Sequence, residues 1–216
     1  MKNPWIGLPS TPPFIAPVDA SFIDVGLDNL LHLRFEVQPD PFLGNLDEAS
    51  VVVLALNPGF EEEDLVTYRK PEYSKQNRLN LLHESTPLFY VLNENLAYSG
   101  GYKWWTRILK QPLTEVSLEQ LSRNLMCIQY FPYHSVTYTH FSPVLPSQKY
   151  SFQLVEEAIH RGKTIIVMRS EKLWLEAVPA LKETGYIKLK NPRNPVLSPN
   201  NMEDYEYQRF MRALLT

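Results

Sequence analysis

The sequence has a single cysteine, no long apolar run and no excess of basic side chains. One cysteine, Cys127, excludes an internal disulfide framework and a zinc site built from several cysteines. The longest uninterrupted aliphatic run, Val51–Leu56, has six residues, whereas a transmembrane helix needs about 20 apolar residues. We therefore expect no contact with a membrane.

Charge and histidine spacing limit the partners further. A net charge of −3 argues against electrostatic capture of nucleic acid by the molecule as a whole, and leaves only a local basic cleft as an alternative. The start of the chain lacks the apolar segment of a secretory signal peptide. Four of the five histidines, His32, His83, His140 and His160, show no metal-ligand spacing, and the fifth, His134, is considered below. We expect a cytoplasmic monomer with no metal and no cofactor.

The composition is that of a folded domain preceded by a proline-rich N-terminal segment. The chain has 216 residues, of which 44% are hydrophobic and 12% aromatic, enough for one packed core. Residues 1–41 carry seven of the 18 prolines, and proline lacks the N–H that helices and central strands need. We expect a Pro-rich arm on the surface with a short helix near Ala20–Phe35, followed by an α/β domain over residues 42–216.

Apolar runs alternate with helical patterns in that domain. The expected strands are Ser50–Leu56, Leu125–Phe131, Thr164–Met168 and Tyr186–Leu189. Strands that alternate with helices form parallel βαβ units. The sequence therefore predicts a three-layer α/β/α sandwich around a mostly parallel, four-stranded sheet. The polar stretch between Glu61 and Arg78 is expected to be a loop.

Three segments that follow these strands carry the side chains suited to chemistry. They are residues 57–60, 129–135 and 191–198, and each combines proline with amide, aromatic or hydroxyl side chains. In open α/β sheets the ligand lies outside the carboxyl ends of the strands. We therefore expect the three segments to meet at one edge of the sheet.

Two of these segments resemble the active-site motifs of the uracil-DNA glycosylase superfamily. Asn57-Pro58-Gly59 is similar to the first motif of the mismatch-specific and single-strand-selective branches. The loop Asn191–Ser198 is similar to the second motif, a His or Asn, then Pro and, after a few residues, Leu-Ser. The middle strand, ending before Pro132, resembles the segment that supplies base-recognition contacts. The resemblance implies a uracil-DNA glycosylase-like hydrolase in DNA repair, which excises uracil or another damaged base from DNA.

The resemblance also gives each matching residue a role. Asn57 would orient a water molecule that faces the sugar carbon. Asn191 or Asn194 would donate to the base oxygen as negative charge develops there. The residues expected to contact the extruded base are Gly59, Phe60, Gln129, Phe131 and His134. Leu197 would fill the vacated stack, and Ser198 would contact a phosphate.

A cationic strip lies close to the second motif. Lys188, Lys190 and Arg193 fall within a stretch that has no acid, and they are the best candidates for contact with nucleic-acid phosphates. Four acids, Glu61–Asp64, follow the first motif and should repel phosphates. A second interpretation is therefore a non-catalytic nucleic-acid or nucleotide-binding protein of the same fold. A third is an unrelated hydrolase that uses Tyr133, His134 and Ser135.

Overall fold

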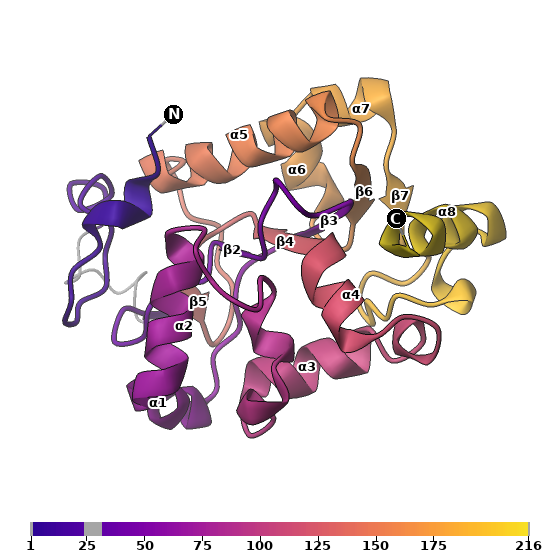
Figure 1. Ribbon diagram of the computed structural model, residues 1–216. Helices are drawn as coiled ribbons and strands as arrows, with labels where there is room; N and C mark the ends of the chain where they lie inside the picture. The colour runs from indigo at the N-terminus through magenta and orange to yellow at the C-terminus, as the bar shows by residue number, and fades with distance from the viewer. Residues whose placement is uncertain (1, 24–31, 216) are drawn as a thin grey trace.

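The computed structural model describes residues 2–23 and 32–215 and has an α/β fold (Figure 1). Its main sheet has five strands in the order β2-β4-β3-β6-β7. Their bounds are β2 Phe42–Leu43, β3 Val51–Ala55, β4 Leu125–Gln129, β6 Thr164–Val167 and β7 Ile187–Lys188. The four expected strands are all present and parallel, and the antiparallel edge strand β2 is an addition to the predicted four.

Strand β3 lies at the centre of the sheet because it is apolar on both faces. All five of its residues are buried, as in parallel strands covered on both sides. Val51 and Val53 pack with side chains of α3, α4 and α8, whereas Val52 and Leu54 pack with those of α5, α6 and α7. Two apolar clusters therefore lie on opposite faces of one sheet.

Helices lie on both sides of the sheet (Figure 1). The first set comprises α3 Gly100–Ile108, α4 Leu118–Asn124 and α8 Asp204–Leu215. The second comprises α5 Pro146–His160, α6 Glu171–Ala177 and α7 Ala180–Thr184. The chain also has short 3-10 turns, η1 Pro4–Gly7, η3 Tyr90–Leu92, η4 Glu94–Leu96, η5 Pro112–Thr114 and η6 Pro199–Asn201. None of the helices formed by residues 2–23 and 32–215 is long and apolar enough to cross a membrane.

The expectation of a loop between residues 61 and 78 was wrong. This segment forms α1 Glu62–Arg69 and α2 Pro71–Leu81. The Asp64 carboxylate accepts a hydrogen bond from the backbone N–H of Glu61 at 2.8 Å and so caps the start of α1. The two helices bury tyrosine, threonine and asparagine side chains more than aliphatic ones. Their sequence therefore shows little apolar periodicity.

The Pro-rich arm is anchored in the core rather than lying on its surface. Trp5 is fully buried, and the Arg78 guanidinium donates to the carbonyl oxygens of Leu8 and Pro9 at 2.6 and 3.1 Å. Residues 24–31, half of the helix expected at Ala20–Phe35, lie outside the described residues. Part of the remainder is strand β1, Leu33–Arg34, which pairs antiparallel with β5, His134–Ser135.

Candidate functional site

Asn57 connects two of the three segments that the sequence singles out. Its Nδ2 donates to the carbonyl oxygen of Pro58 and to Oγ of Ser135, both at 2.8 Å. The backbone N–H of Ser135 donates to the same Pro58 carbonyl at 3.2 Å, and Gly59 forms a bridge with Ser135. Among the described residues, none donates to Oδ1 of Asn57. That oxygen is therefore free to accept a hydrogen bond from water.

The backbone next to Asn57 is open on one side. Gly59 is exposed, and a Cβ placed on it would have no atom within 4 Å. A ligand can therefore approach this backbone closely. Phe60 is less accessible, because its ring is buried and the Arg34 guanidinium lies 4.9 Å from the ring centroid.

His134 holds this loop from the inside. The side chain is only 4% exposed, and its Nδ1 lies 2.7 Å from the carbonyl oxygen of Gly59, to which it donates. Its Nε2 lies 2.9 Å from the hydroxyl of Tyr68 and 3.5 Å from a carboxylate oxygen of Asp40. Both ring nitrogens are thus occupied. His134, expected to contact the base, instead positions the backbone next to Asn57.

The neighbouring carboxylate of Asp40 changes the pKa of His134. Burial by itself lowers the pKa of His134, but the hydrogen bond and the negative charge of Asp40, together with the Gly59 carbonyl, outweigh burial and raise it above its ordinary value. The protonated imidazolium is the form that donates from both nitrogens. The fold therefore favours a charged His134 beneath the Asn57 loop.

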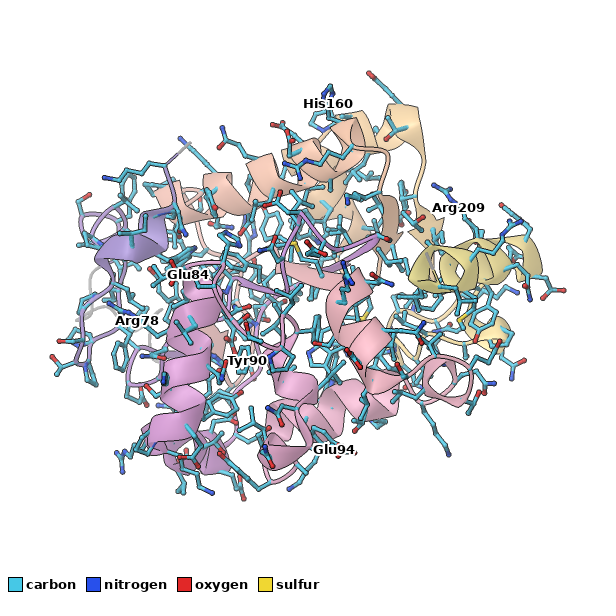
Figure 2. All side chains as sticks on the ribbon, viewed as in Figure 1. Arg78, Glu84, Tyr90, Glu94, His160 and Arg209 are labelled. Atoms are coloured by element: carbon cyan, nitrogen blue, oxygen red, sulfur yellow. The ribbon has the colours of Figure 1, made fainter. Side chains whose placement is uncertain are left out.

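Asp40 is the centre of a buried polar cluster that the sequence analysis missed. Its carboxylate accepts hydrogen bonds from Tyr68, from Asn77 and, at 3.4 Å, from Tyr90. Tyr90 lies between α2 and α3 (Figure 2). The only sign of this cluster in the sequence is that Asp40 lies between two prolines, Pro39 and Pro41. Its partners come from later parts of the chain, and no local pattern identifies them.

One of the four acids after the first motif lies near the same cluster. Glu61, Glu62 and Glu63 are exposed, whereas Asp64 is half-buried on α1. Burial raises the pKa of Asp64, and the charge of His134 opposes that rise. A carboxyl group therefore lies close to the loop that carries Asn57.

Gln129 ends β4 at the edge where the base is expected. It is 9% exposed, and its Oε1 has no hydrogen-bond partner among the described residues. Buried amide oxygens are normally hydrogen-bonded, so an unpaired one is consistent with a ligand contact. Phe131 is 1% exposed and packs against Tyr133 and Phe141. Its ring is therefore not available to stack on a base.

The loop that resembles the second motif is organised by its own amides. Oδ1 of Asn191 accepts from the backbone N–H groups of Arg193 and Asn194 at 3.2 and 3.3 Å. Asn201, which the sequence analysis did not consider, donates to the carbonyl oxygens of Asn194 and Val196. Asn191 and Asn194 are both exposed. The side chain of Asn191 thus supports the turn.

Two residues expected to contact DNA in this loop differ in accessibility. Leu197 is fully buried, and its backbone N–H donates to the carbonyl of Ile108 at 3.0 Å. A side chain that fills a vacated base stack has to be exposed, so the expectation for Leu197 was wrong. Ser198 is partly exposed and precedes η6.

The cationic strip is partly neutralised by acids from other parts of the chain. Lys188 lies 2.7 Å from the carboxylate of Glu171, and Lys190 lies 3.4 Å from that of Glu203. The stretch that carries these lysines has no acid of its own, but the fold supplies one for each. Among the described residues, Arg193 has no carboxylate partner.

Tyr133, His134 and Ser135 do not point toward a common centre. The Tyr133 hydroxyl donates to Asp19 at 2.7 Å and accepts from the backbone N–H of Ala16. Ser135 is bonded to Asn57. No hydrogen bond joins His134 to Ser135 in the described part of the chain. The serine therefore has no adjacent base to activate it, which removes the geometric basis for the unrelated hydrolase.

The structure brings Asn57, Gly59 and the segment after β4 into direct contact. The loop at residues 191–198 follows β7, two strands away at the same edge of the sheet. Nη2 of Arg169, which follows β6 between them, lies 3.5 Å from the carbonyl oxygen of Arg193. No hydrogen bond links Asn57 to Asn191 or Asn194 among the residues that the structure describes.

Comparisons with protein-family models, curated proteins and solved structures find no match for this chain. Within residues 2–23 and 32–215, no group of three or more His, Cys, Asp or Glu side chains could hold a metal ion.

Proposed function

We propose that this chain is a uracil-DNA glycosylase-like hydrolase with a three-layer α/β/α fold. It would cleave the N-glycosidic bond of uracil or another damaged base in DNA. The observation that carries the proposal is the state of Asn57, whose amide nitrogen is held by Pro58 and Ser135 while its carbonyl oxygen has no donor among the described residues. The packing of helices against both faces of the sheet supports the layered fold.

The proposed reaction uses Asn57 to position water. Glycosidic bonds break through an oxocarbenium-like state, and a water held opposite the departing base attacks the sugar carbon. The bonding electrons leave with the base, which takes up a proton from solvent, and the attacking water loses a proton to solvent as its oxygen bonds to the sugar carbon. An amide orients water but cannot accept its proton, so we expect slow excision. Gln129, with its unpaired Oε1, would contact the edge of the base.

Release of free base is the test. The purified protein is incubated with single- and double-stranded DNA that contains uracil, and free uracil is measured. We expect release by the native chain and loss of release in Asn57→Ala. The control is Asn95→Ala, because Asn95 is exposed and far along the chain from the site. Absence of release from any deaminated base would overturn the enzymatic proposal.

A second candidate is a nucleotide-binding protein of the same fold without excision. Three exposed acids, Glu61–Glu63, follow Gly59 and Phe60 directly, and they disfavour a polyanion near the site. Lys188 and Lys190 are already paired with acids. Thermal stabilisation by a nucleotide, without release of base from DNA, would select this candidate.

A further inference from the structure

Arg169 lies where an open α/β sheet places its ligand. It follows β6, and the backbone N–H groups of Met168 and Arg169 both reach the carbonyl oxygen of Leu54 on β3, at 2.9 and 3.3 Å. In the sheet, β4 lies next to β3 on one side and β7 lies next to β6 on the other. The connection that follows β3 and the connection that follows β6 therefore run in opposite directions. The gap between β3 and β6 is therefore the point where the strand order reverses, at which such sheets bind ligands.

The guanidinium of Arg169 is half-buried and poorly satisfied. Its Nε is buried and has no hydrogen-bond partner in the described part of the chain. Within residues 2–23 and 32–215, its one side-chain hydrogen bond, to the carbonyl oxygen of Arg193, has a length of 3.5 Å. A guanidinium presents five N–H donors in a fork that matches phosphate. Most of this donor capacity is unused.

Two further arginines lie near Arg169. Arg107 is on α3, and its charge, after burial, lowers the pKa of Arg169. Arg193 is in the loop that contacts Arg169. This loop is also fastened to the end of α3, because Leu197 donates to Ile108. The charge of Arg107 on α3 thus acts on Arg169 at the end of β6, and the backbone of Arg193 in the loop after β7 contacts it.

Among the described residues, the three arginines form no ion pair with a carboxylate, whereas the two lysines at the same edge of the sheet do. Lys188 and Lys190 each have a carboxylate within 4 Å. None of the ion pairs among residues 2–23 and 32–215 includes Arg107, Arg169 or Arg193. Arg107 and Arg193 are exposed and Arg169 is half-buried. The charge of Arg107 disfavours the charge of Arg169, and a bound anion would offset that repulsion.

We propose that Arg169, assisted by Arg107 and Arg193, binds a phosphate group of the ligand whose base occupies the Asn57 site. The proposal rests on the proposed function for the presence of a base, but the arginines by themselves select the phosphate. A phosphate next to the base occurs in a DNA strand and in a mononucleotide alike. The anion would bond to the unused donors of Arg169.

Binding measurements on the full chain separate the phosphate from the base. Affinities are measured for deoxyuridine, its 5′-monophosphate and inorganic phosphate. We expect the monophosphate to bind about tenfold more tightly than the nucleoside, as for one charge-assisted hydrogen bond. Arg169→Gln should abolish that advantage, and Arg169→Lys should restore part of it. Arg209→Gln is the matched control, because Arg209 is exposed on α8 (Figure 2).

The outcomes distinguish this site from the proposed function. Equal affinity for nucleoside and monophosphate, or an advantage that persists in Arg169→Gln, would overturn the phosphate site. If neither base-containing compound binds but inorganic phosphate raises the Tm only when Arg169 is present, the site stands and the proposed function fails. If inorganic phosphate also has no effect, both fail.

A salt titration identifies the source of the phosphate. For a short single-stranded DNA that contains uracil, each phosphate contact contributes about 0.7 to the slope of log affinity against log salt. A decrease of that size in Arg169→Gln assigns the site to the DNA strand. An unchanged slope, together with loss of the monophosphate advantage, assigns it to a mononucleotide. Each of these results supports the site.

Discussion

His134 donates to the carbonyl oxygen of Gly59 at 2.7 Å and so connects a buried carboxylate to an exposed loop. On one side of the imidazole lies Asp40, held by Tyr68 and Asn77. On the other side lies the turn that carries Asn57. The turn of the candidate site is therefore joined through a buried histidine to a carboxylate in the core.

Protonation of His134 should make stability depend on pH. Because the folded state raises the pKa of His134, protonation stabilises the fold. This contribution is complete below the unfolded-state pKa, about 6.5. It is lost as the pH rises above that value and through the folded-state pKa. The free energy of unfolding of the native chain, minus that of His134→Asn, should therefore fall between neutral and alkaline pH. A difference that is constant or rises with pH would contradict this arrangement.

Loss of the Asp40 carboxylate should destabilise the fold strongly. Asp40→Ala removes the carboxylate that accepts from Tyr68, Tyr90 and Asn77 and lies beside His134 inside the core. We expect the free energy of unfolding in urea to fall by about 3 kcal/mol. Asp47→Ala is the control, since Asp47 makes its ion pair with Arg161 on the surface and should cost less than about 1 kcal/mol. Similar losses in both variants would contradict a structural role for Asp40.

Ser135 should act on the reaction through Asn57. Ser135→Ala removes one of the two oxygens that accept from Nδ2 of Asn57 and leaves the Pro58 carbonyl, so the direction of the amide is less firmly fixed. If the chain excises uracil, we expect release to slow about tenfold, as for the loss of one hydrogen bond. Ser74→Ala, a partly exposed serine on α2, should keep the native rate. An unchanged rate in Ser135→Ala would show that Asn57 needs no such support.

The N-terminal arm should contribute to stability through Tyr133. Its hydroxyl donates to Asp19 and accepts from the N–H of Ala16, both in the arm. Tyr133→Phe leaves the buried N–H of Ala16 without its acceptor and removes one donor from Asp19, whose carboxylate keeps those of Ser147. We expect a loss of about 1 to 3 kcal/mol in the free energy of unfolding. Tyr205→Phe is the control, because Tyr205 is 71% exposed. A loss no greater than that of the control would mean that the arm is not held by this contact.

The central strands β3 and β4 could be predicted because almost all of their residues are apolar and all are buried. A run such as Val51–Ala55 is distinctive by composition alone. Helices α1 and α2 could not be predicted in this way, since Tyr68, Tyr73 and Asn77 take the buried positions that aliphatic side chains usually occupy. Strands β1, β2 and β5 have two residues each, too few for any periodicity.

Only the part of the candidate site that directly follows predicted strands could be predicted from the sequence. The rule that ligands lie at the carboxyl ends of strands selected Asn57 and Ser135, which do meet. The same rule applies to Arg169, which lies two residues after the end of the buried strand β6, but the sequence-based prediction did not include this residue. Asp40 and the acids that pair with Lys188 and Lys190 lie far away along the chain. Their contacts are a product of the tertiary fold and leave no local pattern.

A crystal structure of the protein soaked with uracil would show whether the strand-end segments share one ligand. We expect the base at the carboxyl edge of β3 and β4, within hydrogen-bond distance of Gln129 and facing Asn57 Oδ1 across the position of the attacking water. Uracil bound elsewhere, with Asn57 and Gln129 both untouched, would contradict a base-binding site at this edge.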